Sequence, residues 1–229
     1  MEFSRSISLK RLTMTPIEQL TFLLRAVPIT LSISLLSFLL GLTLGIIFSF
    51  IRIYGIAPLR YIADGYEKVF RSVPVLSIMF LLYFGLGGYI PIFKDSYLTS
   101  VIALGLVSGA NQSQIFRSSI GSIGRSQMLA ATSLGLSSFK ALRHVILPQA
   151  LFLAVPGLGS EIALLIKDSS YSFIIGVLEL MKHTDILRAA TRSLVFPYIA
   201  SALIYVALTF PLATYLDKWG SKKKRELGL

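Results

Sequence analysis

Few polar groups interrupt the apolar parts of this chain, and one of them is an acid that could bind a solute. Glu161 stands inside an apolar run. A charged group near the middle of a bilayer costs about 2.5–3.5 kcal/mol on insertion scales, so it usually faces a cavity or a partner. We therefore take Glu161 as the first candidate for a solute path, with an ammonium or guanidinium group as its counterpart. A structural ion pair, or a position at the external end of the span, is the alternative.

Five more polar residues close to apolar runs are candidates for the same path. Asn111, Gln112 and Gln114 could line a cavity or hydrogen-bond between helices. Lys167 and Asp168 are adjacent, so their side chains point in different directions on a helix. Snorkelling of the lysine, or pairing of either charge between subunits, competes with solute contact at these two positions.

The chain lacks the residues that several other kinds of chemistry require. The chain has no cysteine, which excludes disulfides and thiolate metal sites, and its two histidines, His144 and His183, lie far apart in the sequence. No Gly-x-x-x-x-Gly-Lys-[Ser/Thr] loop is present to hold nucleotide phosphates. A membrane-embedded enzyme would need paired acids, a Ser/Lys pair or a metal site within its spans. We expect no enzymatic activity, no metal and no cofactor.

The composition indicates a membrane protein. Of the 229 residues, 54% are hydrophobic and only 14% are charged, whereas roughly a quarter of the residues in a soluble domain are charged. The net charge of +11 fits lysines and arginines that flank spans on the cytoplasmic side and meet anionic lipid. Since no nucleic-acid recognition motif accompanies that charge, we do not expect nucleic acid as a partner.

Apolar runs predict an all-α protein that crosses the membrane about five times. A helix needs roughly 20 apolar residues to cross the hydrocarbon. A membrane domain over residues 26–220 is expected between a polar N-terminal segment (1–25) and a basic cytoplasmic tail (221–229). Gly41 and Gly45 in the first run either allow close helix packing or reflect the abundance of glycine in membrane helices. The expected spans are residues 26–51, 68–93, 96–117, 145–166 and 193–216, the fourth being broken by prolines. Residues 61–70 either begin the same helix as the second span or form a kinked approach to it.

Residues 118–144 are too polar to span and, by the distribution of lysine and arginine, are expected to be cytoplasmic. Gln127 begins a run of good helix formers that Gly135 ends, at a C-cap position where a positive φ costs glycine least. Ser137 or Ser138 can cap the next helix. This pattern predicts a stiff elbow whose apolar side chains dock into a groove on a cytosolic partner; a helix lying on lipid is the alternative. The docking side chains are expected to be Met128, Leu129, Leu134 and Leu136.

The same segment carries a resemblance to a known family. Residues 129–151 resemble the cytoplasmic signature loop of ABC importer permeases of the polar amino acid uptake type, a pattern of Glu-Ala-Ala, three residues, Gly, and a later Leu-Pro. Further similar blocks are Arg71-Ser72-Val73-Pro74, Ile115-Phe116-Arg117 and Lys167-Asp168-Ser169-Ser170, so that the resemblance covers roughly residues 26–220. The matching loop residues are Ala130, Ala131, Leu134, Gly135, Leu147, Pro148, Gln149, Ala150 and Leu151.

The resemblance implies a type I ABC importer permease fold in a multi-pass protein of the cell membrane. It also implies three partners: a nucleotide-binding ATPase subunit, a second permease subunit (the same or a different one) and an extracytoplasmic solute-binding protein. The solute would be a polar amino acid or a close analogue, and Ser169 joins the candidates for its path. The coupling residues in the ATPase cleft would be Gln127, Leu129, Ala130, Ala131, Leu134, Gly135, Leu136, Phe139 and Pro148.

Two positions depart from the family pattern. Leu129 stands where the loop usually begins with Glu, and Gln114 stands where Glu usually precedes Ile-Phe-Arg. The first change removes one polar contact and a capping role. From a different class of protein, the alternative function is an ion-coupled secondary transporter or channel that works without an ATPase. It predicts charge pairs in two symmetric halves, and no such repeat is visible in the sequence.

Overall fold

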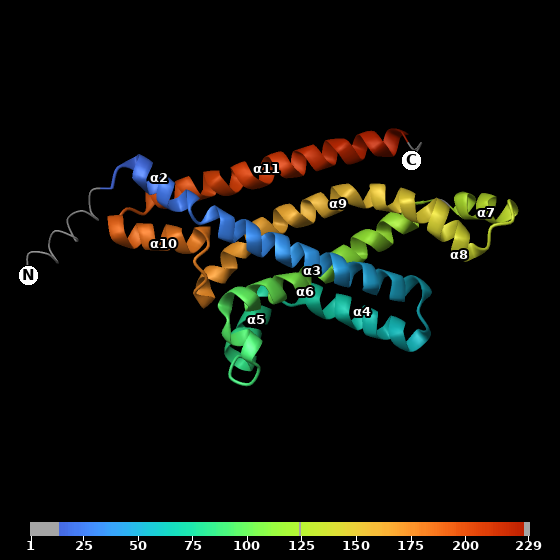
Figure 1. Ribbon diagram of the computed structural model, residues 1–229, viewed down its shortest axis with the longest axis horizontal. Coiled ribbons are helices and arrows are strands. Elements are labelled where there is room, and N and C mark those ends of the chain that lie inside the picture. The colour runs from blue at the N-terminus through green and yellow to red at the C-terminus, as the bar shows by residue number, and fades with distance from the viewer. Residues whose placement is uncertain (1–13, 124, 227–229) are drawn as a thin grey trace, which may run out of the picture.

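The computed structural model describes residues 14–123 and 125–226, in which every regular element is a helix and no strand occurs. Four long helices, α3 (Val27–Tyr54), α6 (Ser96–Ser122), α9 (Leu147–Asp168) and α11 (Val195–Glu226), run roughly along the long axis of the molecule (Figure 1). Short helices α2 (Pro16–Leu24) and α10 (Leu180–Thr191) lie at one end, and α7 (Arg125–Ser133) and α8 (Ser138–Ala141) project at the other.

The remaining elements complete the bundle beside α3 and α6. Helix α4 (Ala57–Ser72) returns along these two helices, and α5 (Val75–Phe80) then turns away from it (Figure 1). Short 3-10 or π-helical turns connect or extend the helices; these are η1 (Leu81–Leu86), η2 (Pro91–Lys94), η3 (Leu142–Ile146) and η4 (Ser169–Ile175).

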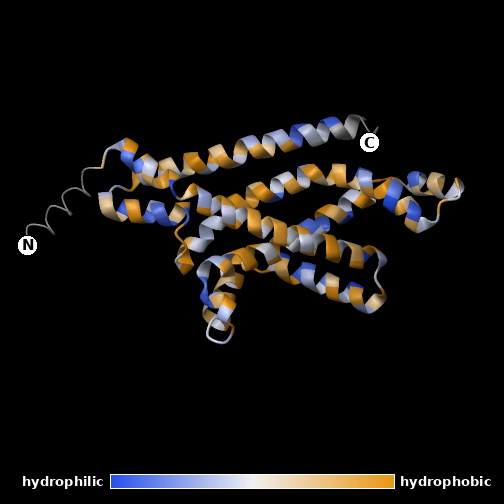
Figure 2. Ribbon diagram, viewed as in Figure 1, coloured by the Kyte–Doolittle hydropathy of each residue, from blue (hydrophilic) through white to orange (hydrophobic). Residues whose placement is uncertain are grey.

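Three stretches of the described chain are long and apolar enough to cross a membrane: Pro16–Tyr54, Ser138–Ile175 and Val195–Lys222. The bent pair Ala57–Ser72 and Val75–Leu86 makes a fourth if it is one broken span. Helix α6 has the length of a span but a polar sequence, and many of its side chains are buried against α3, α4 and α9. A helix surrounded by protein does not need an apolar surface. Figure 2 shows the contrast between apolar α3 and the polar ends of the bundle.

The expected span over residues 68–93, whose start was left open between one continuous helix and a kinked approach, consists of two helices that meet at 102°. The break falls at Val73, which is extended (φ −91°, ψ 129°), immediately before Pro74. Proline disfavours the helical conformation of the residue before it and supplies no amide hydrogen for the helix. The apolar composition of this run was visible in the sequence, but the size of the bend was not.

Three other helix bounds differ from the sequence expectation. The polar segment 1–25 contains α2 in its described part, begun by a capping box in which Thr15 and Glu18 bond reciprocally. The run expected to be a broken span, 145–166, is the continuous helix α9, with Pro148 in its first turn and Pro156 inside it. Helix α11 continues well past residue 216 to Glu226, so the described part of the basic tail is helical; residues 227–229 lie outside the described chain.

Helices α3 and α6 form the most extensive helix pair, and glycines let them approach closely. A Cβ at Gly41 would lie 2.7 Å from Oγ of Ser108, and one at Gly45 would lie 2.7 Å from Cβ of Gln112. Both distances are shorter than van der Waals contact, so these positions accept only glycine at this helix separation. The close-packing interpretation of Gly41 and Gly45 therefore holds.

Candidate functional site

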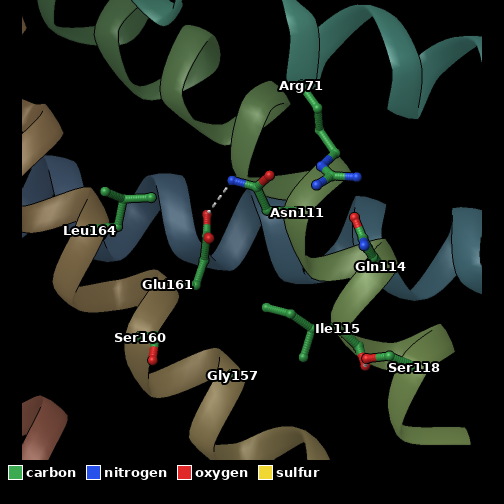
Figure 3. A pocket seen from close by; sticks show the side chains of 9 residues that line it. All are labelled: Arg71, Asn111, Gln114, Ile115, Ser118, Gly157, Ser160, Glu161 and Leu164. Carbon is green, nitrogen blue, oxygen red and sulfur yellow. Dashed lines mark hydrogen bonds between the residues drawn. The ribbon is translucent and has the colours of Figure 1, made fainter.

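A pocket of about 460 Å³ lies among α4, α6 and α9. Figure 3 shows Arg71 entering it from α4, Asn111 and Gln114 from α6, and Glu161 from α9. The other lining residues are Ile115, Ser118, Gly157, Ser160 and Leu164. The wall thus combines one acid, one base, two amides and two hydroxyls with a few apolar groups, which is a lining suited to a small polar molecule.

Glu161 is held in this pocket by α6. The residue is only 6% exposed, and Nδ2 of Asn111 donates a hydrogen bond of 3.4 Å to its carboxylate. Ser108, one turn earlier on α6, is a second hydrogen-bond partner of the same carboxylate. The Ser108 hydroxyl in turn accepts a bond of 2.9 Å from Gln112, whose amide also donates to the carbonyl oxygen of Phe38 on α3. The acid therefore has a defined position but no basic partner among the described residues.

Arg71 supplies the opposite charge. It ends α4 just before the bend at Val73, and its guanidinium reaches towards Asn111 and Gln114 (Figure 3). Within the described chain it forms no ion pair or hydrogen bond. The side-chain oxygen of Gln114 is buried and likewise has no hydrogen-bond partner there. The pocket thus offers a carboxylate, a guanidinium and an amide oxygen with capacity for further bonds.

The other residues expected on the solute path lie elsewhere. Gln112 is fully buried between α6 and α3 and does not line the pocket, although it supports Glu161 through Ser108. Lys167 is exposed, and the buried hydroxyl of Ser169 donates to the carbonyl oxygen of Ile166. Asp168 is half-buried near the end of α9, outside the pocket lining.

Three polar pocket residues were not singled out for the path from the sequence: Arg71, Ser118 and Ser160. Gln114 was expected to line a cavity or to hydrogen-bond between helices, and it does line the pocket, one helical turn after Asn111. Arg71 carries no such sequence signal, because only the packing of α4 against α6 brings it to the pocket that Glu161 also lines.

The expected elbow is present as α7, α8 and η3 and projects from the end of the bundle (Figure 1). Gly135 has a φ of +85°. The amide of Leu136 donates to the carbonyl oxygen of Ala131, and that of Gly135 to the carbonyl oxygen of Thr132, which together form a Schellman motif. Ser137 caps α8 by accepting from the Lys140 amide. These hydrogen bonds give the elbow a defined shape.

The outer surface of the elbow is apolar. Leu129, Leu134 and Phe139 are 65%, 85% and 70% exposed. Ala130 and Pro148 are also exposed, whereas Gln127 and Leu136 are half-buried. Ala131 is buried, and Met128 packs inward against a small core of Ile123, Leu142, Ile146 and Ala150. Met128 and Leu136 therefore support the elbow from within more than they enlarge its exposed face.

A buried acid on α4 was missed in the sequence. Glu67 has a side chain that is only 4% exposed; it pairs with Arg52 of α3 and, at 3.4 Å, with Arg117 of α6. Ser113 donates to its other oxygen at 2.6 Å. Asp64 pairs with Arg52 at 2.5 Å. This ionic cluster connects three helices at the end of the bundle that carries the elbow.

These features define a class of protein: a helical membrane permease that has a polar pocket among its helices and a projecting elbow to which another subunit can bind. Comparison with known proteins agrees. Residues 41–219 match the family model described as "Binding-protein-dependent transport system inner membrane component". The arginine transport system permease protein ArtQ of Bacillus subtilis (strain 168) is 35% identical over 207 residues, covering 90% of this chain and 94% of that protein. The L-cystine transport system permease protein TcyL of the same organism is 34% identical, covering 79% and 78%.

Solved structures are also similar. A permease chain in the crystal structure of an amino acid ABC transporter with histidines superposes with a TM-score of 0.84 at 28% identity, covering 92% of this chain and 99% of that one. An inward-facing methionine ABC transporter gives a TM-score of 0.74 at 18% identity, which shows the shared fold.

This chain belongs to the ABC importer permeases of the polar amino acid uptake family. The resemblance drawn from the signature loop, the all-helical membrane fold and the location in the inner membrane are therefore confirmed. As an inner membrane component of a binding-protein-dependent system, the chain is a non-catalytic permease subunit that works with an ATPase and a solute-binding protein. The alternative of a transporter working without an ATPase is set aside.

Proposed function

We propose that this chain forms the membrane pathway for a polar amino acid and that the pocket among α4, α6 and α9 binds the solute during passage. The observation that carries the proposal is the presence of Glu161 and Arg71 in one pocket inside an apolar bundle, neither with an ion-pair partner among the described residues. Relatives with the same fold are named for transport of arginine, glutamine, cystine and octopine.

The chemistry of the lining matches the two ends of an amino acid. The ammonium group would meet Glu161, and the α-carboxylate would meet Arg71, where a planar guanidinium can donate two parallel hydrogen bonds. Asn111, Gln114 and Ser160 add neutral donors and acceptors for a polar side chain. Glu161 is buried, so solvent screens its charge less, which strengthens its interaction with an ammonium group.

The elbow is the coupling element of this proposal. The exposed side chains of Leu129, Leu134 and Phe139 insert into a cleft of the ATPase subunit, the helix-in-groove mode of recognition. Leu129 gives that contact an apolar group where the family has Glu. Movement of the ATPase then reaches the pocket through η3 and α9, which join the elbow to Glu161 in one helical stretch.

The proposal also includes a second permease subunit and the extent of the membrane domain. A second permease subunit, identical or related, completes the pathway. The membrane domain extends over residues 26–220, with α3, the bent pair of α4 and α5, α6, α9 and α11 as its spans. The exposed apolar side chains along α11, such as Leu203, Val206 and Phe210, face lipid or that second subunit.

Uptake into proteoliposomes that contain the permease with its ATPase and binding protein tests the proposal. Radiolabelled glutamine, cystine and arginine serve as solutes. Glu161→Gln should lower uptake of the preferred solute at least tenfold while the complex still assembles. Asp217→Asn, which removes an exposed acid of α11 far from the pocket, should leave uptake unchanged. Normal uptake by the Glu161→Gln complex would contradict the assignment of the pocket.

A further inference from the structure

A second pocket, of about 400 Å³, adjoins the solute pocket. Arg71 lines both of them. The remaining lining residues are Arg52, Glu67, Lys68, Ser72 and Arg117. Four of the six are basic, in contrast to the single base of the first pocket.

The positive charges of this inner pocket exceed the negative ones. Arg52 is neutralised by Asp64 and Glu67, and Arg117 reaches Glu67 only at 3.4 Å. Lys68 and Arg71 have no ion pair or hydrogen bond within the described chain. Two carboxylates therefore face four cations. The Nε atom of Arg117 is also buried without a hydrogen-bond partner, which is a donor available to an acceptor that enters the pocket.

The inner pocket lies nearer the elbow than Glu161 and Asn111 do, beside the part of the solute pocket that Ser118 lines. Arg117 follows Asn111 on α6 by nearly two turns, about 9 Å at about 1.5 Å per residue. Arg52 is in the last turn of α3, at the same end of the bundle. A solute that leaves Glu161 and Arg71 towards the cytoplasm thus meets these cations next.

We propose that the inner pocket is a second, transient binding site, which receives the carboxylate of the solute as it leaves the first pocket. This inference rests on the proposed function of the first pocket. Arg71 holds the carboxylate in the first site and, because it lines both pockets, passes it to Lys68 and Arg117. Glu67 is the resident counter-ion of the cluster, and the incoming carboxylate competes with it for Arg117.

The excess charge has a consequence for the class of solute. A zwitterionic or acidic amino acid is attracted by its carboxylate, whereas a solute with a net positive charge, such as arginine, is repelled by the unpaired cations. The importer therefore favours amino acids without net positive charge, although Glu161 alone would favour a cation. The phosphate of an anionic lipid offers similar chemistry to the same cations, so the experiment has to distinguish the two sources.

The test uses the complete importer in phosphatidylcholine vesicles, with and without phosphatidylglycerol, and measures initial uptake of labelled glutamine, cystine and arginine. The central variant is Lys68→Gln, because Lys68 is exposed and bonds to nothing that holds the fold. Lys68→Arg restores the charge. Lys222→Gln removes a lysine that is exposed on α11 outside both pockets.

Lys68→Gln should reduce the maximal rate for glutamine or cystine relative to arginine by about tenfold, as expected for loss of one nearby charge in a partly shielded site. The half-saturating concentration should change little, since the first pocket sets it. Lys68→Arg should recover the ratio, and Lys222→Gln should not alter it.

Three results would overturn the inference: an unchanged ratio in Lys68→Gln, uptake of arginine alone by the wild type, or an effect that appears only with phosphatidylglycerol. The Glu161→Gln complex separates the two proposals. If it fails to take up solute while Lys68→Gln behaves as wild type, the first pocket stands and only the second site is lost.

Discussion

Glu67 is a buried acid of the described chain that bonds to side chains of two other helices. It accepts from Arg52, Arg117 and Ser113, which belong to two helices other than its own. Glu67→Leu should lower the free energy of unfolding by about 1.5–3 kcal/mol, because hydrogen bonds to charged groups are lost and two arginines keep their charge. Thermal unfolding in detergent measures the effect. Asp64→Asn, which touches only the more exposed Arg52 contact, should cost clearly less; equal losses would argue against a central role for Glu67.

A single functional residue can be predicted from the sequence when its polarity differs from that of the residues around it. Glu161 could be predicted as a pocket residue because an acid within an apolar run needs a partner or a cavity. Arg71 and Glu67 could not, because both lie in or at the end of an amphipathic helix where charges are ordinary. Their function depends on which helices cross there, and residues as far apart as Glu67 and Arg117 meet only in the folded chain.

The elbow depends on the conformation of one glycine. Gly135 has a φ of +85° with open space around it, so a side chain there meets backbone strain and no steric clash. Gly135→Val should cost about 1–2 kcal/mol locally and tilt α8 against α7. The expected outcome is ATP hydrolysis that no longer drives uptake. Uptake and ATPase activity measured on the same vesicles give the coupling ratio, which is the solute taken up per ATP hydrolysed. The control is Gly121→Val, at a glycine of α6 that also has open space around it. A full coupling ratio in Gly135→Val would contradict the importance of the turn.

At the opposite end of the bundle, Glu179 fixes the start of α10. Its carboxylate accepts from the amides of Met181 and Lys182, each at 2.8 Å, and from the Tyr205 hydroxyl at 3.1 Å. Burial raises the pKa of Glu179 from 4.5 to about 7, despite these hydrogen bonds. Between those values the folded protein keeps a proton that the unfolded chain releases, so stability falls as pH rises from about 4.5 to about 7.

Glu179→Gln should remove this part of the pH dependence, which amounts to about 3 kcal/mol at about 1.4 kcal/mol per pH unit. Midpoints of thermal unfolding from pH 4.5 to 8 measure it as the difference between wild type and variant. Parallel curves for the two proteins would show that the carboxyl is ionised throughout.

The bounds of α7 and α8 could be predicted because specific residues mark them. Gly135 adopts the turn that follows α7, and the side chain of Ser137 caps the start of α8. The ends of α6 and α11 were placed too early, because a helix continues into water after its apolar run has ended. Pro156 was taken for a break, yet α9 accommodates it within a continuous helix.

The molecule as a whole places two adjoining pockets beside α4 and α6, one completed by α9 and the other by α3, with the elbow at the same end of the bundle as the second. The family and fold class could be predicted because the signature loop is local in sequence. The pockets could not, because each is lined by segments that lie far apart in the chain. What sets their geometry is the separation between α3 and α6, and therefore the two glycines that allow it.

Gly45→Leu tests that dependence for the entire bundle. A Cβ at this position would lie 2.7 Å from Cβ of Gln112 and 3.0 Å from the backbone nitrogen of Ser113, so α6 has to move. Overpacking of this kind costs about 1–3 kcal/mol. The displacement of α6 also shifts Asn111 away from Glu161 and Ser113 away from Glu67, so both pockets should lose function together. The expected result is a lower midpoint of thermal unfolding and loss of uptake for every amino acid.

Gly65→Leu is the control. This glycine lies on the exposed face of α4 with nothing within 4 Å, so the change should alter neither measurement. Loss of stability with full uptake would mean that the pockets tolerate a wider α3–α6 spacing and that another contact positions Glu161.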